Sequence, residues 1–315
     1  MTKPFASTAD LAEQRSTLEE LAPGVFAFTA EGDPNVGAIV GSDSVFAVDA
    51  RATPTAAREW LTTLRERTEL PVRYLALTHY HAVRVLGASA FGADWVIAHE
   101  TTRRWIDERG VQDFESEARR FPRLFRDIDS VPGLTHPNVG FADTLTLLLG
   151  DREVQLLHLG GGHTEGDTVV WLPHERVLFA GDLVEARAAP YMGDASIHAW
   201  STGTLDRLRA LEAAALVPGR GPALHGPEVG DAIDETRDYL RTLWECVRQV
   251  YEREGTLRDA FDAARRTLEP RFGEWWIFEH CLPFNVARAW DEAGGSPPQI
   301  WTAEKDAAVW AELQG

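Results

Sequence analysis

The order of apolar and polar positions along the chain predicts strands that alternate with helices. Three short runs rich in β-branched and aromatic residues, Val25–Ala30, Val36–Val40 and Ser44–Asp49, are separated by turn residues and predict a strand meander. Apolar residues then recur at helical spacing in Pro54–Leu70. A further strand, Tyr74–Thr78, runs directly into a pair of histidines.

The second half of the pattern adds two hairpins and a long helical region. The charged stretch from residue 100 to 129 favours a pair of helices, and from about Asp231 onward the sequence is almost entirely helical, with breaks near Gly255, Pro270 and residues 294–298. Two sets of strands with helices between and after them predict two sheets sandwiched by helices. The predicted hairpins pair Thr144–Leu149 with Val154–His158, and Thr168–Leu172 with Val177–Ala180.

Composition and charge narrow the classes of partner. The 315 residues are 44% apolar and 25% charged, which are ordinary values for a globular protein. The net charge of −18 repels phosphate backbones and anionic lipid surfaces, so we expect neither nucleic acid nor a membrane as a partner. The first residues lack the basic start and apolar run of a signal peptide, which predicts a cytoplasmic protein. The oligomeric state is left open.

Three histidines and one aspartate stand apart because they follow predicted strands or a glycine-rich turn. His79 and His81 come directly after a buried strand, and the alternation of an extended chain points both rings the same way. His163 follows three glycines, and Asp182 ends another strand. Three neutral imidazoles with an open fourth position are typical of catalytic zinc, and they also suit iron. The sequence therefore predicts a metal site at these strand ends.

The same residues belong to an ordered series of motifs. Thr78–His81, Gly162–Asp167, Phe179–Asp182 and Val217–Gly221 resemble, in order and spacing, the motif series of the metallo-β-lactamase superfamily. Val45–Asp49 resembles that family's strand ending in a supporting aspartate. The resemblance implies an α/β (α+β) fold, an αβ/βα four-layer sandwich of two mixed β-sheets flanked by helices, with metal at one edge.

The resemblance divides the chain into three parts. Residues 1–22 are expected to form a polar leader with one or two helical turns around Asp10–Leu21. Residues 23–230 are expected to form the metallo-β-lactamase-like core, with residues 100–140 as a helical insertion over the site. Residues 231–315 are expected to form a helical C-terminal extension.

The chain departs from the family pattern at the positions that bind a second metal. The family's first motif usually continues His-x-His-x-Asp-His, but this chain has Val83 and Arg84 there. Arg220 stands where the last motif usually holds a histidine. Arginine is always charged and has no lone pair to offer a cation. We therefore expect one divalent metal, zinc with iron as the alternative.

The metal ligands implied by the resemblance are His79, His81 and His163, with Asp182 beside them. His225, five residues after Arg220, is considered as a substitute ligand, but a loop position at the rim of the pocket is the preferred interpretation.

Other residues are expected to support these ligands or to line the pocket. Asp49 is predicted to hydrogen-bond a ligand loop without binding metal, and Thr164 to support the ligands in the same way. Tyr80 is predicted to point away from the metal. It joins His225 and His280 as a candidate pocket residue.

Arg84 and Arg220 are predicted to take over part of the electrostatic work of a second metal. Their two charges against Asp182 leave about one positive charge, which predicts a small anionic substrate held by the arginine forks. In the alternative, both arginines bridge Asp182 and main-chain carbonyls and hold the pocket shut.

Three functions fit these residues. The first is a hydrolase in which one metal lowers the pKa of bound water to roughly 7, with an ester, thioester, lactone or amide as substrate. In it Asp182 is expected either to ligate the metal as a fourth ligand or to hold that water for attack. The second is non-haem iron chemistry on oxygen or persulfide. The third is a non-catalytic binding protein. We prefer the first.

Overall fold

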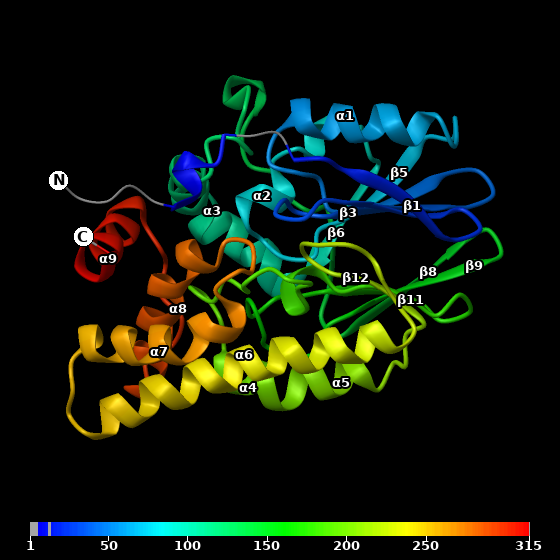
Figure 1. Cartoon of the computed structure of the whole chain (residues 1–315). Helices are drawn as coiled ribbons and strands as arrows, with labels where there is room; N and C mark the ends of the chain where they lie inside the picture. Colours follow the sequence, from blue (N-terminus) through cyan, green and yellow to red (C-terminus); the bar gives the residue numbers. More distant parts are fainter. Residues whose placement is uncertain (1–5, 12–13, 315) are drawn as a thin grey trace.

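Two mixed β-sheets lie face to face at the centre of the computed structural model, which describes residues 6–11 and 14–314 (Figure 1). Strands β1 to β4 pair antiparallel and β4 to β7 parallel, whereas the second sheet is antiparallel except between β11 and β12. The first sheet has the order β1 (Thr17–Ala22), β2 (Val25–Thr29), β3 (Val36–Val40), β4 (Val45–Val48), β5 (Val72–Ala76), β6 (Trp95–His99) and β7 (Val139–Phe141). The second sheet has the order β13 (Leu224–His225), β12 (Ala215–Val217), β11 (Val177–Phe179), β10 (Val169–Leu172), β9 (Arg152–Leu157) and β8 (Thr144–Leu149).

The two sheets pack through apolar side chains. Ile39 of β3, Phe46 of β4 and Phe179 of β11 are buried in one cluster between the sheets. All four residues of β4 are buried, as expected for a strand that is covered on both faces.

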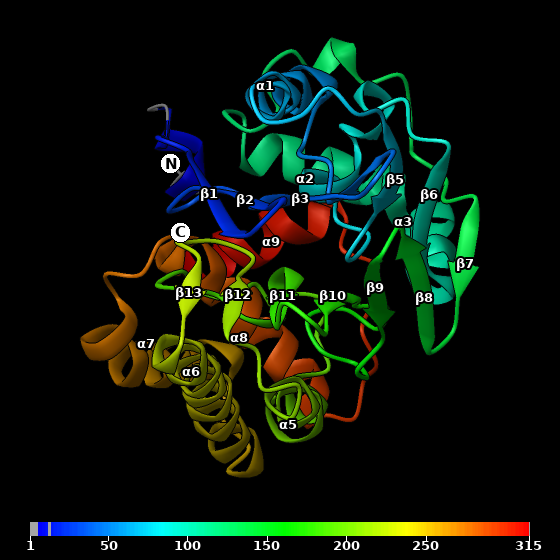
Figure 2. The same cartoon turned by 90° about the vertical axis from the view of Figure 1, so that its right-hand side faces the viewer.

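Helices cover the outer face of each sheet and complete four layers (Figure 2). Helix α1 (Pro54–Arg65) lies on the first sheet, where it buries Trp60 and Leu64, and the Thr53 hydroxyl accepts a hydrogen bond from the Ala56 amide at its start. Helices α5 (Leu205–Arg209) and α6 (Pro227–Glu252) lie on the second sheet. This αβ/βα sandwich confirms the predicted fold class.

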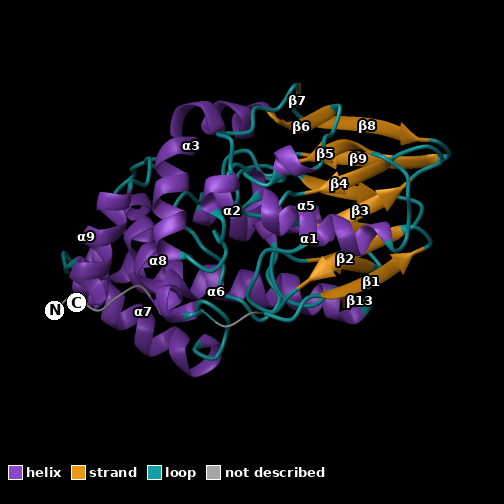
Figure 3. Cartoon of the chain, turned by 90° about the horizontal axis from the view of Figure 1, so that it is seen from above, coloured by secondary structure: helices purple, strands orange, loops and turns teal. Residues whose placement is uncertain are grey.

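The remaining long helices gather at one end of the sandwich (Figure 3). The C-terminal helices among them share a core with the second sheet, because Leu178 of β11 belongs to the same buried cluster as Phe261 and Phe284. Trp105 and Ile106 of the earlier helix belong to the cluster of the first sheet. These helices are α3 (Glu100–Arg120), α7 (Leu257–Phe272), α8 (Phe278–Ala293) and α9 (Ala303–Gln314), while α2 (Ala82–Val85) and α4 (Ile197–Ala199) are single turns.

Three local predictions were wrong. Residues 17–22 form β1 instead of helical turns, because their main chain pairs antiparallel with β2 at the sheet edge. The stretch from residue 100 to 129 holds one long helix, α3, in place of two. Helix α7 runs through Pro270 and ends two residues later, because the proline lies in its last turn. Residues 1–5 and 12–13 of the predicted leader lie outside the described residues. Over the described ranges, no helix combines the length and apolar character needed to cross a bilayer.

Candidate metal centre

Three histidine rings meet at the ends of the central strands. His79 and His81 follow β5, and His163 lies in the loop between β9 and β10. One ring nitrogen of each lies within 4.8 Å of the others, and the ring centroids are 4.7–4.8 Å apart with nearly perpendicular planes. Their exposed fractions are only 1–2%. The structure thus brings together the three ligands that the sequence predicted.

Thr78 and Asp49 orient the His79 ring. The Thr78 hydroxyl donates to Asp49 Oδ2 over 2.9 Å, so its oxygen accepts from His79 Nδ1 at 3.0 Å. Asp49 Oδ1 also accepts from the Thr78 amide at 2.8 Å. Asp49 therefore makes the contact with the ligand loop that we expected, and His79 Nε2 is left facing the other histidines.

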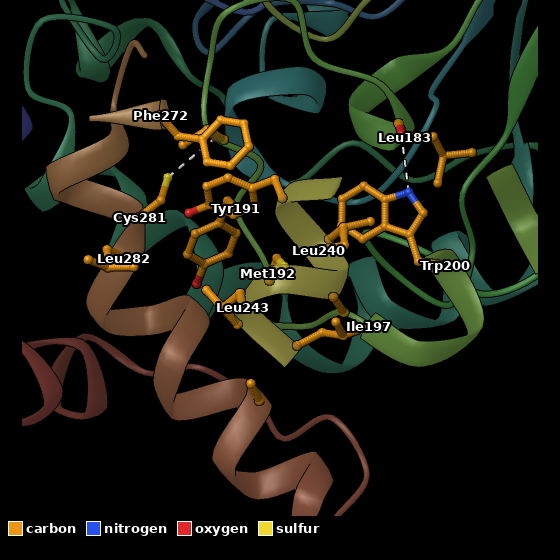
Figure 4. Close-up of a cluster of buried hydrophobic side chains, with 14 of the residues drawn as sticks. Leu183, Tyr191, Met192, Ile197, Trp200, Leu240, Leu243, Phe272, Cys281 and Leu282 are labelled. Carbon is orange, nitrogen blue, oxygen red and sulfur yellow. Dashed lines mark hydrogen bonds between the residues drawn. The ribbon is translucent and has the colours of Figure 1, made fainter. Parts of the chain in front are cut away.

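A main-chain carbonyl and a tryptophan orient the His163 ring. Its Nδ1 donates to the Tyr191 carbonyl over 2.7 Å, which leaves Nε2 for the centre. Trp200 lies edge-on to this ring at 6.0 Å between centroids and donates Nε1 to the Leu183 carbonyl at 3.1 Å (Figure 4). Leu183 directly follows Asp182, so the same tryptophan connects the two strand-end loops.

A buried carboxylate orients the His81 ring. His81 Nε2 lies 3.0 Å from Asp194 Oδ2, which also accepts from the Tyr80 hydroxyl at 2.6 Å. His81 Nδ1 consequently faces the centre, 2.9 Å from His163 Nε2. Tyr80 points away from the centre, as the strand alternation predicted.

These nitrogens fit a metal ion. His79 Nε2 is a buried nitrogen without a hydrogen-bond partner among the described residues, and the remaining two donor nitrogens face each other. Three imidazole nitrogens, each with its other nitrogen engaged in a hydrogen bond, are the donor set of a zinc-type site. His79, His81 and His163 form a metal-binding site.

The protonation of the three rings differs because their surroundings differ. Burial lowers the pKa of His79 well below its ordinary value, and burial together with His81 lowers the pKa of His163 to about 3. Burial also acts to lower the pKa of His81, but Asp113, the hydrogen bond to Asp194 and Glu117 outweigh it and raise that pKa to about 9. Two of the three ligands are therefore neutral at pH 7 without any ion.

Asp182 lies beside the histidines and is held by two arginines. Its Oδ2 is 3.8 Å from His79 Nε2 and 3.6 Å from His163 Nε2. Arg84 donates to Oδ1 and Arg220 Nη1 lies 3.2 Å from Oδ2. Burial alone would raise the pKa of Asp182, but Arg84 and Arg220 hold it well below its ordinary range.

Arg84 occupies a closed cage between the two sheets. Besides Asp182, its guanidinium donates to the carbonyls of Gly219 at 2.8 Å and Asn35 at 2.6 Å, and Nη1 lies 3.5 Å from Asp49 Oδ2. Only 1% of Arg84 is exposed. These contacts agree with the alternative in which the arginines bridge Asp182 and main-chain carbonyls.

The predicted excess of one positive charge is absent, because one further ionised carboxylate, that of Asp49, faces the arginines. Asp49 lies beside Arg84, and burial raises its pKa to about 6, so that it is ionised at pH 7. Arg220 also contacts Glu185 at 3.0 Å, and burial with the nearby Asp182 raises the pKa of Glu185 to about 8. The two arginines thus face two ionised carboxylates at pH 7. The anionic substrate stays a prediction, now without this support.

Two glycines permit the close approach at Asp182. Gly181 has φ of 54°, a left-handed conformation that favours glycine, and a Cβ there would lie 3.0 Å from the Thr78 side chain. A Cβ at Gly219 would lie 2.4 Å from Asp182 Oδ1. The glycines of both motifs are therefore required by the geometry of the site.

The other predicted residues lie outside the centre. The Thr164 hydroxyl donates to Asp167 at 2.7 Å and closes its own turn. His225 was wrongly considered for the pocket, because it points outward from β13 and lies 2.7 Å from Glu19 on the surface. His280 is buried on α8, with its Nε2 3.4 Å from Arg120 Nη1. Arg120 lies over the ring of Tyr191, so His280 contacts Arg120 and not the histidines of the centre.

Sequence reasoning missed four contributors: Asn35, Glu185, Asp194 and the inner face of α3. Asp113 and Glu117 of α3 accept hydrogen bonds from the amides of Ala82 and Val83, at 2.6 and 2.8 Å. The four-residue spacing of these acids was a signal that they share a helix face.

The fold and the centre together have counterparts among known proteins. A model of the metallo-beta-lactamase superfamily matches residues 29–220. The chain belongs to this superfamily. The metallo-beta-lactamase type 2 of Bacteroides fragilis is 35% identical over 122 residues, which cover 37% of this chain and 46% of that protein.

Two solved structures have a fold similar to that of this chain. A metallo-beta-lactamase from Pontibacter korlensis aligns with a TM-score of 0.58 and 21% identity over 72% of this chain and 99% of its own. The sec-alkylsulfatase Pisa1 from Pseudomonas sp. aligns with a TM-score of 0.71 and 16% identity over 88% of this chain and 50% of its own. The chain thus spans about half the length of Pisa1 and of the Bacteroides protein.

Proposed function

We propose that this superfamily member is a hydrolase that works with a single divalent metal ion, zinc in preference to iron. The observation that carries the proposal is that one half of the centre has three histidine nitrogens, whereas the other half has an arginine. Three imidazole nitrogens converge on one point, while Arg84 fills the other half and pairs with Asp182 and Asp49. The histidine half offers lone pairs to a metal cation, whereas the other half already contains the guanidinium cation of Arg84.

The residues of the chain divide the work in this proposal. His79, His81 and His163 would hold the ion, which supplies a nucleophilic water at neutral pH and polarises the scissile group. Asp182 keeps its negative charge because two arginines bind it, and its Oδ2 points toward the ligand nitrogens of His79 and His163. It is placed to accept a hydrogen bond from an attacking water and to orient it.

The substrate class is proposed from chemistry that this kind of site supports. Esters, thioesters, lactones and amides all place a carbonyl carbon where a water can attack, and relatives in the superfamily are named as beta-lactamases and alkylsulfatases. Because the three histidines are almost fully buried, a substrate can reach them only when a covering segment moves.

The test is turnover by chain loaded with zinc, measured against a carboxylic ester, a thioester, a lactone, a β-lactam and an alkyl sulfate. We expect hydrolysis of at least one class by wild type and its loss, together with the metal, in His163→Ala. The matched control is His225→Ala, which removes an exposed histidine and should keep both metal and turnover. Iron with oxygen uptake in place of hydrolysis would contradict the proposal, as would a wild-type chain that binds no metal.

A further inference from the structure

Asp194 is the only carboxylate among the described residues that bonds directly to the second nitrogen of a histidine in the centre. The corresponding partners of His79 and His163 are neutral, a threonine hydroxyl and a main-chain carbonyl. His81 instead places Nε2 3.0 Å from Asp194 Oδ2. This inference rests on the proposed metal site, and it concerns what makes the three ligands unequal.

The environment of Asp194 keeps its carboxylate in place. The residue is 1% exposed and belongs to the loop that follows Tyr191, whose carbonyl orients His163. Its Oδ2 accepts from the Tyr80 hydroxyl at 2.6 Å, and its Oδ1 lies 3.6 Å from Arg109 Nη1 of α3. The inserted helix therefore supplies the only cation that faces the free oxygen of this carboxylate in the described part of the chain.

Aromatic contacts fix the arginine in turn. The Arg109 guanidinium lies 3.8 Å from the ring centroid of Trp105, and the Trp105 ring meets Tyr80 edge-on at 5.2 Å. Such stacking restricts a guanidinium that would otherwise be free to turn. Trp105, Arg109 and Tyr80 thus form one packed unit around Asp194.

The hydrogen bond to Asp194 determines which ring nitrogen of His81 carries the proton. A carboxylate that accepts from Nε2–H fixes the proton on that nitrogen and leaves the lone pair of Nδ1 directed to the centre. It also makes the imidazole a stronger donor than one bonded to a neutral oxygen. We propose that Asp194 is a positioning residue of the metal site, which fixes the tautomer of His81 and makes His81 the strongest of the three ligands.

The test compares zinc affinity in three forms of the 315-residue chain, by competition with a chromophoric chelator. Asp194→Asn keeps the shape and one acceptor oxygen but removes the charge, and we expect its zinc affinity to fall about 10- to 100-fold. The matched control is Asp306→Asn, since Asp306 is also a fully buried aspartate that pairs with an arginine of α3, Arg120, at 3.4 Å. The control should lose thermal stability and keep its zinc affinity.

A second measurement needs no variant. In zinc-loaded wild type labelled with 15N-histidine, long-range proton–nitrogen correlations report which ring nitrogen carries the proton. We expect one metal-bound histidine, His81, to be protonated at Nε2, and the other two at Nδ1. Protonation of all three at Nδ1 would overturn the proposal, even if Asp194→Asn failed to fold.

The outcomes separate this inference from the proposed function. Equal zinc affinity of Asp194→Asn and wild type would overturn the role of Asp194 alone. Zinc binding without turnover on any of the five substrate classes would remove the hydrolase and leave the role of Asp194 standing. Wild type that binds no zinc would overturn both.

Discussion

Arg84 places a buried positive charge between the two sheets, and this charge needs partners. An arginine with 1% exposure is stabilised only by the groups that surround it, here Asp182, Asp49 and two carbonyls. Removing one partner of a buried charge pair is more costly than the pair is stabilising, because the other charge is left in a poor solvent.

Replacement of Arg84 tests whether its role is structural. Arg84→Ala leaves the buried Asp49 without its cation and Asp182 with Arg220 alone, so we expect the free energy of unfolding to fall by about 3–5 kcal/mol. The exposed Arg241 on α6 provides the control, and its replacement by alanine should change stability by less than about 0.5 kcal/mol. Denaturant titration measures both. Unchanged stability with weaker binding of small carboxylates would instead restore the anion-binding role.

Glu185 makes the stability of the site depend on pH. Burial and Asp182 raise its pKa from 4.5 to about 8, so the folded chain keeps a proton that the unfolded chain releases. The stability from this proton is complete below pH 4.5, decreases as the pH rises, and is lost above about pH 8.

Glu185→Gln isolates this contribution. Glutamine keeps the acceptor for Arg220 and cannot titrate, so the melting temperature of the variant relative to wild type should rise from pH 5 to pH 9. Thermal denaturation at pH 5, 7 and 9 measures the difference. A difference that stays constant over this range would show that Glu185 is ionised in the folded chain throughout.

Single residues also show what the sequence could predict about the site. His79, His81 and His163 were predictable, because each follows a strand or a glycine turn that dictates its direction. Asp194 was not, since it meets His81 across 113 positions of sequence and no local pattern links the two. The charge count failed for the same reason, because the ionised carboxylate of Asp49 reaches Arg84 from another element.

At the level of elements, helix α3 buries a charged face. Arg109, Asp113 and Glu117 repeat every four residues, a pattern typical of a solvated face, yet all three lie against the ligand loop with 4–8% exposure. They are tolerated there because main-chain amides and Asp194 provide partners. A helix inserted between β6 and β7 therefore completes the centre from outside the sandwich.

The cap that α3 places on the ligand loop can be removed selectively. Asp113→Ala leaves the buried Ala82 amide without an acceptor, which should cost about 1–3 kcal/mol of stability and weaken metal binding by the adjacent His81. Asp113→Asn keeps an oxygen that can accept from the Ala82 amide, so it should retain most of the stability that Asp113→Ala loses. Equal effects of alanine and asparagine would show that the hydrogen bond to Ala82 is unimportant.

At the scale of the whole molecule, the sandwich was predictable from strand and helix periodicity and from the order of the motifs. A helical insertion over the site was expected, but the contacts that close the site were not predictable. Closure depends on how α3, α8 and the loop before α4 pack over the strand ends, and those contacts join segments that are remote in the sequence.

This closure predicts how a bound metal leaves. Only 1–2% of each histidine ligand is exposed, so we expect that a chelator cannot reach the ion directly. It must wait until one of the segments over the strand ends, α3, α8 or the loop before α4, moves away. The rate of metal loss should therefore become independent of chelator concentration at high concentrations of EDTA. Release that stays proportional to EDTA up to the highest concentrations would mean that the ion is openly accessible.

The central claim, that this chain holds one ion because arginine takes the place of the second, is tested most directly by counting metal. Wild type is loaded with excess zinc, freed of loose metal, and measured by elemental analysis against protein concentration. We expect one equivalent per chain, and two in Val83→Asp/Arg84→His/Arg220→His, which restores the motif residues of the family. Two equivalents in wild type, or none, would contradict it.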